Sequence, residues 1–207
     1  AIDFFKIDDE RIGFIIADVS GKGIPAAIFM AVSRTLIRAT ALHDVSPAEC
    51  MTYSNKLLAK ESVNCMFVTV FYGILNTTTG EFTYCNAGHN PILVIPPDAE
   101  PYYLHSKANI AMDLFGDFAY EAEQIDLKQG TRIIAYTDGV TEAEKADLSQ
   151  YGEDRLLEWA KNIMETSPEM SQMNIVENLY NSVKDFTEGN TQNDDITIVS
   201  LQLEVNS

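Results

Sequence analysis

The chain has 207 residues, and 46% of them are apolar, which supports a packed core and excludes wholesale disorder. Acidic residues outnumber basic ones 31 to 14, so the net charge of −17 argues against binding to nucleic acid or to an anionic membrane surface, both of which attract Lys and Arg. The surplus of carboxylates fits a solvated surface, a few acids that hold divalent cations, or both.

The first part of the chain predicts a strand followed by two helices. Arg11–Val19 is rich in Ile and Phe and predicts a buried strand, which Ser20-Gly21-Lys22-Gly23 ends. Ala26–His43 then carries apolar residues at helical spacing. Ser46-Pro47-Ala48-Glu49 has the pattern of a capping box and predicts a second helix that runs to about Ser62.

Strands dominate the middle of the chain, and helices return before a last strand. The predicted strands are Met66–Leu75, Glu81–Asn86, Pro91–Val94, Tyr120–Leu127, Thr131–Thr137 and Ile196–Leu203, and the predicted helices are Glu153–Glu165 and Pro168–Phe186, the latter opened by Ser167-Pro168. Runs of strands separated by helix pairs indicate an α+β fold with mostly antiparallel sheets. We expect one domain, in which the last strand shares a core with the first because neither half has enough strands alone.

Cysteine usage and hydropathy point to a cytoplasmic protein. Cys50, Cys65 and Cys85 form no C-x-x-C pair, which argues against a disulfide framework or a zinc finger and for a reducing compartment. The longest apolar fragments, such as Ile12–Val19 and Ile24–Val32, fall short of a membrane span, and no signal-peptide pattern is present.

Three times, an acidic residue stands at the tip of a predicted strand. Asp18 and Asp138 each end one, and Asp194 with Asp195 precedes the last one. An isolated buried carboxylate is costly unless it is paired or bound to a metal, so convergence of these tips would form an oxygen-ligand site for Mg²⁺ or Mn²⁺. Each acid alone is more typical of an ordinary turn, and the spacing does not establish convergence.

Other candidate chemistries have weaker support. Ser20-Gly21-Lys22-Gly23 lacks the spacing of a nucleotide-binding phosphate loop, and a triad of Ser20 with His89 lacks the G-x-S-x-G elbow. His89 is more typical of a turn-stabilising residue than of a residue at the mouth of a site. His43 and His105 show no zinc-binding spacing.

Five segments carry a resemblance that spans about Asp3 to Leu203. They are Asp18–Ala27 (D-x-S-G-K-G-x-x-A-A), Asn86–Pro91 (N-A-G-H-N-P), Tyr136–Ala143 (Y-T-D-G-V-T-E-A), Tyr151–Leu156 (similar to F-G-x-x-R-L) and Asn193–Thr197 (D-D-[IM]-T). In this order they resemble the SpoIIE-like branch of bacterial metal-dependent protein phosphatases, within the PPM (type-2C) superfamily.

The resemblance implies a four-layer α-β-β-α sandwich, with two antiparallel sheets flanked by helix pairs and two Mn²⁺ or Mg²⁺ ions at one sheet edge. It implies that Asp18 bridges both metals and that Val19 binds through its backbone carbonyl. Asp138 and Asp194 would complete the shell of one metal. The catalytic residues would then be these three aspartates, acting through a metal-bound water that attacks phosphoserine or phosphothreonine.

Two positions depart from the family pattern. The family carries G-G-D-F-Y-D ahead of its first strand, and Asp3-Phe4-Phe5 aligns with the end of that motif, so the acid that binds the second metal falls just before Ala1. We therefore expect residues 1–207 to be one phosphatase domain that lacks its first strand-turn motif and forms the C-terminal part of a longer sensor or response-regulator protein. Asp113 stands where the family usually has Gly.

The implied activity is that of a protein serine/threonine phosphatase, a phosphoric monoester hydrolase. The implied substrate is a phosphorylated regulatory protein such as an anti-sigma-factor antagonist, and an N-terminal sensor or receiver domain is the other implied partner. Gly21 and Lys22 would form a substrate loop, in which Lys22 either steers the anionic substrate or is an ordinary exposed lysine. The helix pair at 24–62 leaves a homodimer or a regulatory contact open, although packing on the sheet is its commoner use.

A second class of function stays open. A non-catalytic phosphatase-like module would keep the fold and bind a phosphoprotein or a regulatory partner. The acid missing ahead of Ala1 supports this alternative, whereas the presence of Asp18, Asp138 and Asp194 opposes it.

Overall fold

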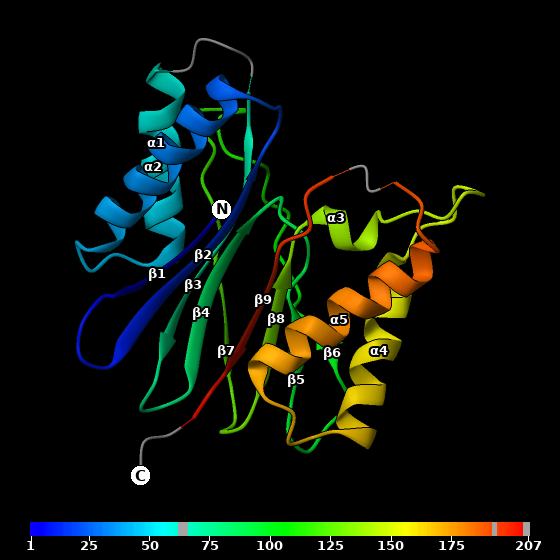
Figure 1. The fold of residues 1–207 in the computed structure, drawn as a ribbon. Coiled ribbons are helices and arrows are strands. Elements are labelled where there is room, and N and C mark those ends of the chain that lie inside the picture. Colours follow the sequence, from blue (N-terminus) through cyan, green and yellow to red (C-terminus); the bar gives the residue numbers. More distant parts are fainter. Residues whose placement is uncertain (62–65, 192–193, 205–207) are drawn as a thin grey trace. The chain divides into compact units, whose positions relative to one another are not determined.

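Strand pairing divides the chain into two units, each with its own sheet. The computed structural model describes residues 1–61, 66–191 and 194–204. The first unit comprises residues 1–89 and 105–127, and the second comprises residues 90–104 and the described part of 128–207. Figure 1 labels their helices and strands along the chain.

The first unit is built on a five-stranded antiparallel sheet in the order β1-β2-β3-β4-β7. Its strands are β1 (Ile2–Lys6), β2 (Arg11–Val19), β3 (Val68–Asn76), β4 (Glu81–Ala87) and β7 (Glu123–Asp126). β2 pairs with β3 over its full length, from Arg11 opposite Asn76 to Val19 opposite Val68. This register places the last residues of β2 beside the first residues of β3.

Two helices cover this sheet. α1 (Ile24–Ala41) packs on β2, and α2 (Pro47–Glu61) packs on β3 and β4. The predicted capping box is confirmed, because Glu49 N donates to Ser46 Oγ over 3.3 Å and Ser46 N donates to Glu49 Oε2 over 3.0 Å. These bonds satisfy two donors and fix where α2 begins.

Asp3 joins the edge strand β1 to α1. Its side chain is only 7% exposed, and its carboxylate accepts from Arg34 Nε over 3.0 Å and from Arg38 Nη1 over 3.2 Å. Arg38 also lies 5.3 Å above the ring of Phe5. A buried carboxylate is stable only where its charge is compensated, so the two arginines allow an acid to lie beneath the helix.

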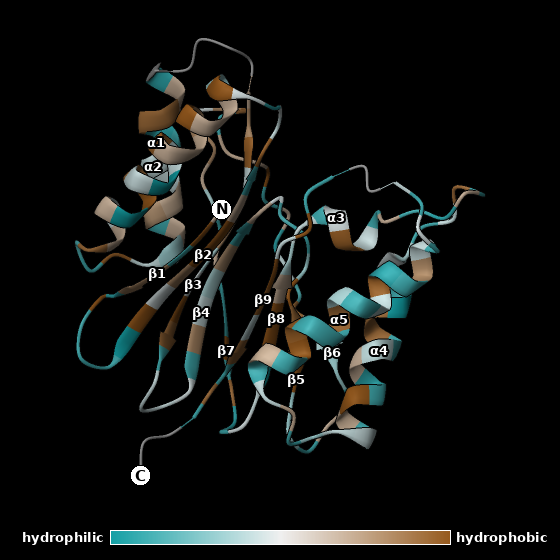
Figure 2. Cartoon of the chain, in the orientation of Figure 1, coloured by the Kyte–Doolittle hydropathy of each residue, from teal (hydrophilic) through white to brown (hydrophobic). Residues whose placement is uncertain are grey.

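The second unit holds a four-stranded antiparallel sheet in the order β6-β5-β8-β9. Its elements are β5 (Leu93–Ile95), β6 (Tyr102–Tyr103), β8 (Arg132–Tyr136), α3 (Asp138–Thr141), α4 (Gly152–Thr166), α5 (Gln172–Thr187) and β9 (Ile198–Gln202). α4 contacts β5 and α5 contacts β9, and a core forms around Tyr136, Trp159 and Leu179. Figure 2 shows hydrophobic residues in the strands and as bands on α4 and α5.

The predicted α+β class is confirmed, with two antiparallel sheets and a helix pair on each. Every predicted strand and helix overlaps an observed one, while β1, β6 and α3 were not predicted. The first and last long strands lie in different sheets: β2 belongs to the first sheet, whereas β9 pairs with β8 in the second sheet, to which β5 and β6 also belong.

The start of α5 also differs from the prediction. Ser167 already ends α4, where its backbone N donates to Ile163 O over 2.9 Å. Ser171 caps α5 instead, because its hydroxyl accepts a hydrogen bond from Asn174 N over 3.2 Å. Ser167 belongs to the end of α4, so Ser171, which does not, serves as the N-cap of α5.

By length and composition alone, α1 could cross a membrane, and it is the one such helix in the part of the chain that the structure describes. Its Ala26, Ser33, Ile37 and Ala41 are buried, and its two arginines pair with Asp3. The same test is passed by core helices of globular domains, and the contacts of α1 are those of a helix that packs on a sheet.

Replacement of Asp3 by Ala should lower the free energy of unfolding by about 1–3 kcal/mol, because it leaves two arginines without their buried partner. Both arginines are half exposed and can be partly rehydrated, which keeps the loss moderate. The matched control is Asp9→Ala, which removes a solvent-exposed ion pair with Lys6 and should cost less than about 0.5 kcal/mol. Urea unfolding of both variants tests this, and equal losses would contradict a structural role for Asp3.

Candidate functional site

Asp18 and Val19 are the last two residues of β2, opposite Thr69 and Val68 on β3. Both are half-buried, and Asp18 Oδ1 accepts from Val19 N over 3.0 Å. The Thr69 hydroxyl donates to the backbone carbonyl of Asp18 over 3.3 Å. The sequence prediction that Asp18 stands at a strand tip is therefore confirmed, and Thr69 fixes the backbone there.

His89 reaches the same strand end from the turn after β4. Its Nδ1 lies 3.1 Å from the Thr69 hydroxyl. Since that hydroxyl gives its proton to Asp18 O, the geometry fits a ring protonated at Nδ1 that donates to Thr69. Asn86 stabilises the turn itself, accepting from His89 N over 2.7 Å and donating to His89 O over 3.0 Å. His89 therefore joins a turn to the strand end.

The loop after β2 is held by Ser20 and shaped by glycine. Ser20 N donates to Phe67 O and Ser20 Oγ accepts from Phe67 N, each over 2.8 Å. Gly21 has φ 119° and Gly23 has φ 85°, a region that side chains with a Cβ rarely adopt. Gly21 and Lys22 are exposed, so Lys22 projects from a backbone whose course is fixed on both sides.

Asp138 lies just after the end of β8 in the second unit. It follows β8 and Thr137 and is the first residue of the short helix α3. The residue is half-buried, and its Oδ1 is buried with no hydrogen-bond partner among the described residues. Such an oxygen loses its hydration without gaining a hydrogen bond, and a bound cation would compensate for that loss.

Thr137 and Gly139 hold the Asp194–Asp195 segment beside Asp138. The Thr137 hydroxyl donates to Asp195 O and accepts from Thr197 N, each over 3.1 Å. A Cβ on Gly139 would lie 2.4 Å from Asp195 O, so only glycine permits this approach. No local pattern in the sequence assigns either residue a role, because both act on a segment almost 60 positions away along the chain.

Negative charge is concentrated at this strand end. The pKa of Glu142 is raised above its ordinary value, first by burial and then by the carboxylates of Asp138, Asp194 and Glu144. Asp194 itself is exposed, which differs from the expected buried carboxylate, and its Oδ1 accepts from Asp195 N over 2.8 Å. Asn193, the first residue of the predicted D-D motif segment, lies outside the described residues.

The donor chemistry fits a hard divalent cation, since carboxylate and carbonyl oxygens are its preferred ligands. Within either unit, however, the described residues contain no group of three or more His, Cys, Asp or Glu side chains placed to hold a metal ion by themselves. Burial raises the pKa of the Cys50 and Cys85 thiols to about 12, so neither is a thiolate ligand or nucleophile at neutral pH. Cys65 lies outside the part of the chain that the structure describes.

Asp113, which stands where the family usually has Gly, adopts a backbone conformation that favours glycine. Its φ is 71°, in the left-handed region that favours Gly and, among other residues, tolerates Asp and Asn best. Its backbone N donates to Asn55 Oδ1 over 2.8 Å, which holds it in that conformation. The substitution is therefore compatible with the loop.

Solved structures identify the class of this fold. The PP2C phosphatase domain of SpoIIE from Bacillus subtilis matches with a TM-score of 0.81 at 17% identity, over 100% of this chain and 59% of that one. RsbX, solved in complex with magnesium, matches with a TM-score of 0.67 at 20% identity, over 98% and 87%. The fold is that of a PP2C-type phosphatase domain.

Residues 8–204 match the family model of stage II sporulation protein E (SpoIIE), and the chain belongs to this family. Phosphoserine phosphatase RsbU of Bacillus subtilis (strain 168) is 29% identical over 206 residues, which cover 97% of this chain. The chain spans 58% of the length of RsbU. The resemblance drawn from the five sequence segments is thus confirmed at the level of the family.

Replacement of Thr137 by the isosteric Val should lower the free energy of unfolding by about 1–3 kcal/mol, since Asp195 O and Thr197 N lose their shared partner. The control is Thr166→Val, whose exposed hydroxyl bonds back to Asn162 O within α4 and lies 3.4 Å from Ser167 Oγ, and which should cost less than about 0.5 kcal/mol. Urea unfolding compares the two variants. A Thr137→Val protein as stable as the control would show that the hydroxyl does not hold the Asp194 segment.

Proposed function

We propose that the chain is a metal-dependent protein serine/threonine phosphatase that hydrolyses phosphoserine or phosphothreonine. The observation that carries the proposal is the buried Oδ1 of Asp138, which has no hydrogen-bond partner among the residues that the structure describes and lies beside the acidic Asp194 segment. An unpaired carboxylate among other acids is costly in the absence of a cation, and it is a suitable ligand in its presence. Membership of the SpoIIE family and similarity to a phosphoserine phosphatase support the same activity.

Four residues would hold the metal ions. Asp18 would bind Mn²⁺ or Mg²⁺ through its carboxylate, and Val19 would contribute its backbone carbonyl. Asp138 and Asp194 would contribute their carboxylates. Two such cations, when bound, would supply an activated water as the nucleophile and neutralise charge on the phosphoryl oxygens. These assignments rest on the family motifs and on the donor chemistry described above.

The chain's own residues position these groups. Thr69 fixes the backbone at Asp18, while Thr137 and Gly139 set the distance of the Asp194 segment from Asp138. Lys22 is exposed on its glycine loop, and in this proposal its charge would attract an anionic phosphoester. The Ser20 hydroxyl accepts the Phe67 N–H and so contributes to holding this loop.

The proposed substrate is a phosphorylated regulatory protein, namely an anti-sigma-factor antagonist, in the cytoplasm. The proposed partners are this phosphoprotein and an N-terminal sensor or receiver domain joined ahead of Ala1. Similarity to RsbU over nearly the whole chain supports this assignment, and the two described cysteines are buried and free, as expected in a reducing compartment.

The choice between an enzyme and the alternative, a non-catalytic module that binds a phosphoprotein, depends on the acid that the family places ahead of Ala1. β1 and β2 pair with Ile2 opposite Ile16, and Ala17 N donates to Ala1 O over 2.8 Å. Continued by one residue, this register sets the position ahead of Ala1 opposite Asp18. An aspartate at that position would therefore stand beside Asp18 and would be a further candidate metal ligand.

The activity is tested by hydrolysis of p-nitrophenyl phosphate in Mn²⁺, for residues 1–207 and for the chain extended upstream through the natural motif. We expect the extended protein to be active, and its Asp18→Ala variant to lose at least 100-fold in kcat/KM, a loss of about 2.7 kcal/mol in transition-state stabilisation. An extended protein with the acid in place that does not exceed its Asp18→Ala variant would exclude the enzyme and leave the binding module.

Asp138→Ala should weaken Mn²⁺ binding at least tenfold in calorimetry and leave the metal-free protein folded. Its stability without metal should be unchanged or higher by up to about 1 kcal/mol, because removal of one carboxylate relieves repulsion with its acidic neighbours. Glu177→Ala, an exposed acid on α5, serves as the control and should change neither quantity. Strong destabilisation of Asp138→Ala in metal-free buffer would contradict a metal role for this residue.

A further inference from the structure

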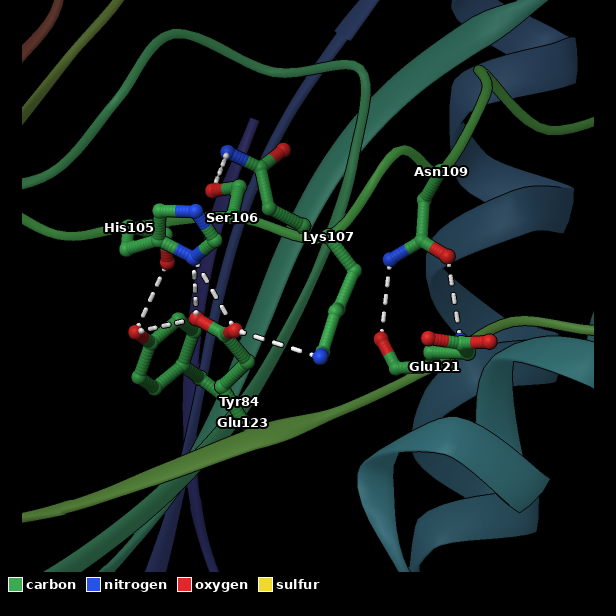
Figure 3. A network of polar contacts seen from close by, with 8 residues as sticks. Tyr84, His105, Ser106, Lys107, Asn109, Glu121 and Glu123 are labelled. Carbon is green, nitrogen blue, oxygen red and sulfur yellow. Dashed lines mark hydrogen bonds and ion pairs between the residues drawn. The ribbon is translucent and has the colours of Figure 1, made fainter.

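A closed loop between residues 109 and 121 presents two exposed apolar side chains next to the strand end of the first unit. Its base is closed by Asn109, whose Oδ1 accepts from Glu121 N over 3.0 Å and whose Nδ2 donates to Glu121 O over 2.8 Å (Figure 3). At the start of β7, Glu123 accepts from Tyr84 over 3.2 Å and pairs with His105 at 3.0 Å. The two ends of the loop are therefore held together, and β7 begins two residues after Glu121.

The middle of the loop is attached to β3. Met112 and Val68 exchange two backbone hydrogen bonds, of 2.8 and 3.2 Å. Val68 faces Val19 of β2 on its other side, so Met112 lies two strand spacings, about 10 Å, from Val19. A Cβ on Gly88 would lie 3.0 Å from Ala111 N, which shows that the loop also runs against the turn that carries His89.

The tip of the loop is fixed to α2 by a fully buried asparagine. Asn55 accepts from Asp113 N over 2.8 Å and donates to Phe115 O over 2.8 Å. Gly116 lies so close to α2 that an added Cβ would come within 2.7 Å of Ala59 Cβ. The backbone of the tip is thus held on both sides of Leu114 and Phe115.

The side chains of Leu114 and Phe115 at the tip are exposed to solvent. Leu114 is 48% exposed and Phe115 is 70% exposed, although the backbone between them is anchored to a buried residue. Single exposed apolar residues are common on proteins, but an adjacent pair on a fixed backbone is a pre-organised contact that loses little freedom on binding. Aromatic residues of this kind are enriched at the centres of protein interfaces.

We infer that Leu114 and Phe115 form a docking tip for the protein substrate, contacting apolar surface that flanks its phosphoserine. This inference rests on the proposed function. A net charge of −17 gives the chain no long-range attraction for a phosphorylated protein, so affinity must come from short-range contacts. The tip offers such contacts about two to three strand spacings from Val19, within reach of one small protein surface.

The test uses the full-length natural protein with two probes, p-nitrophenyl phosphate and an anti-sigma-factor antagonist domain phosphorylated on serine. For Phe115→Ala, KM for the phosphorylated domain should rise about tenfold, while kcat stays within twofold and turnover of p-nitrophenyl phosphate is unchanged. Phe115→Leu should retain most of the affinity. Met173→Ala, which removes a side chain of similar exposure (73%) on α5, should change neither probe.

Three outcomes would overturn the inference. Phe115→Ala could leave KM for the phosphorylated domain unchanged, or it could impair both probes equally, which would indicate a structural role at the strand end. It could also convert a dimer to a monomer in light scattering without changing KM, which would place a second copy of the chain on the tip.

Failure of the proposed function is recognised separately. If the parent protein turns over neither probe in Mn²⁺, the phosphorylated domain is titrated without metal against the parent and Phe115→Ala. A tenfold loss of affinity in the variant would then support docking without catalysis, and equal affinities would refute the docking tip.

Discussion

Like-charge repulsion is the constraint on which the strand end of the second unit depends. Asp138, Glu142 and Asp194 gather there, and burial together with these acidic neighbours raises the pKa of Glu142. The segment is held in place by uncharged contacts, namely the hydroxyl of Thr137 and the space left by Gly139. These contacts fix the segment without adding positive charge, and carboxylates held in this way suit a divalent cation.

Asp3 shows the opposite solution for the same side chain. Its carboxylate is more deeply buried than those of Asp18 or Asp138, yet two arginines neutralise it and tie β1 to α1. Such a pair contributes to the structure and offers little to a ligand, because its charge is already compensated. Asp3 therefore has a structural role, which its position in the sequence alone does not reveal.

The sequence predicted what local chemistry determines. Apolar periodicity located the long strands and all the long helices, and the Ser46–Glu49 pattern located the start of α2. β1 escaped prediction because an edge strand with alternate exposure has no long apolar run, and α5 was misplaced because Ser167 and Ser171 carry equal local signals. The roles of Thr137 and Gly139 depend on pairing with a segment far along the chain, which no local pattern encodes.

The charge of the chain bears on how it would meet a protein. At physiological ionic strength, charges farther apart than about 8 Å are largely screened, so the surplus of acids repels an anionic partner mainly at close range. A loop that projects apolar side chains from an anchored backbone makes contact without desolvating those acids. In the proposed arrangement, the carboxylates at the strand ends would serve the cations and the phosphate, while Leu114 and Phe115 would serve the protein that carries it. Asn55 connects the two tasks. It holds the tip against α2, and α2 also covers β3, the strand whose Thr69 positions Asp18.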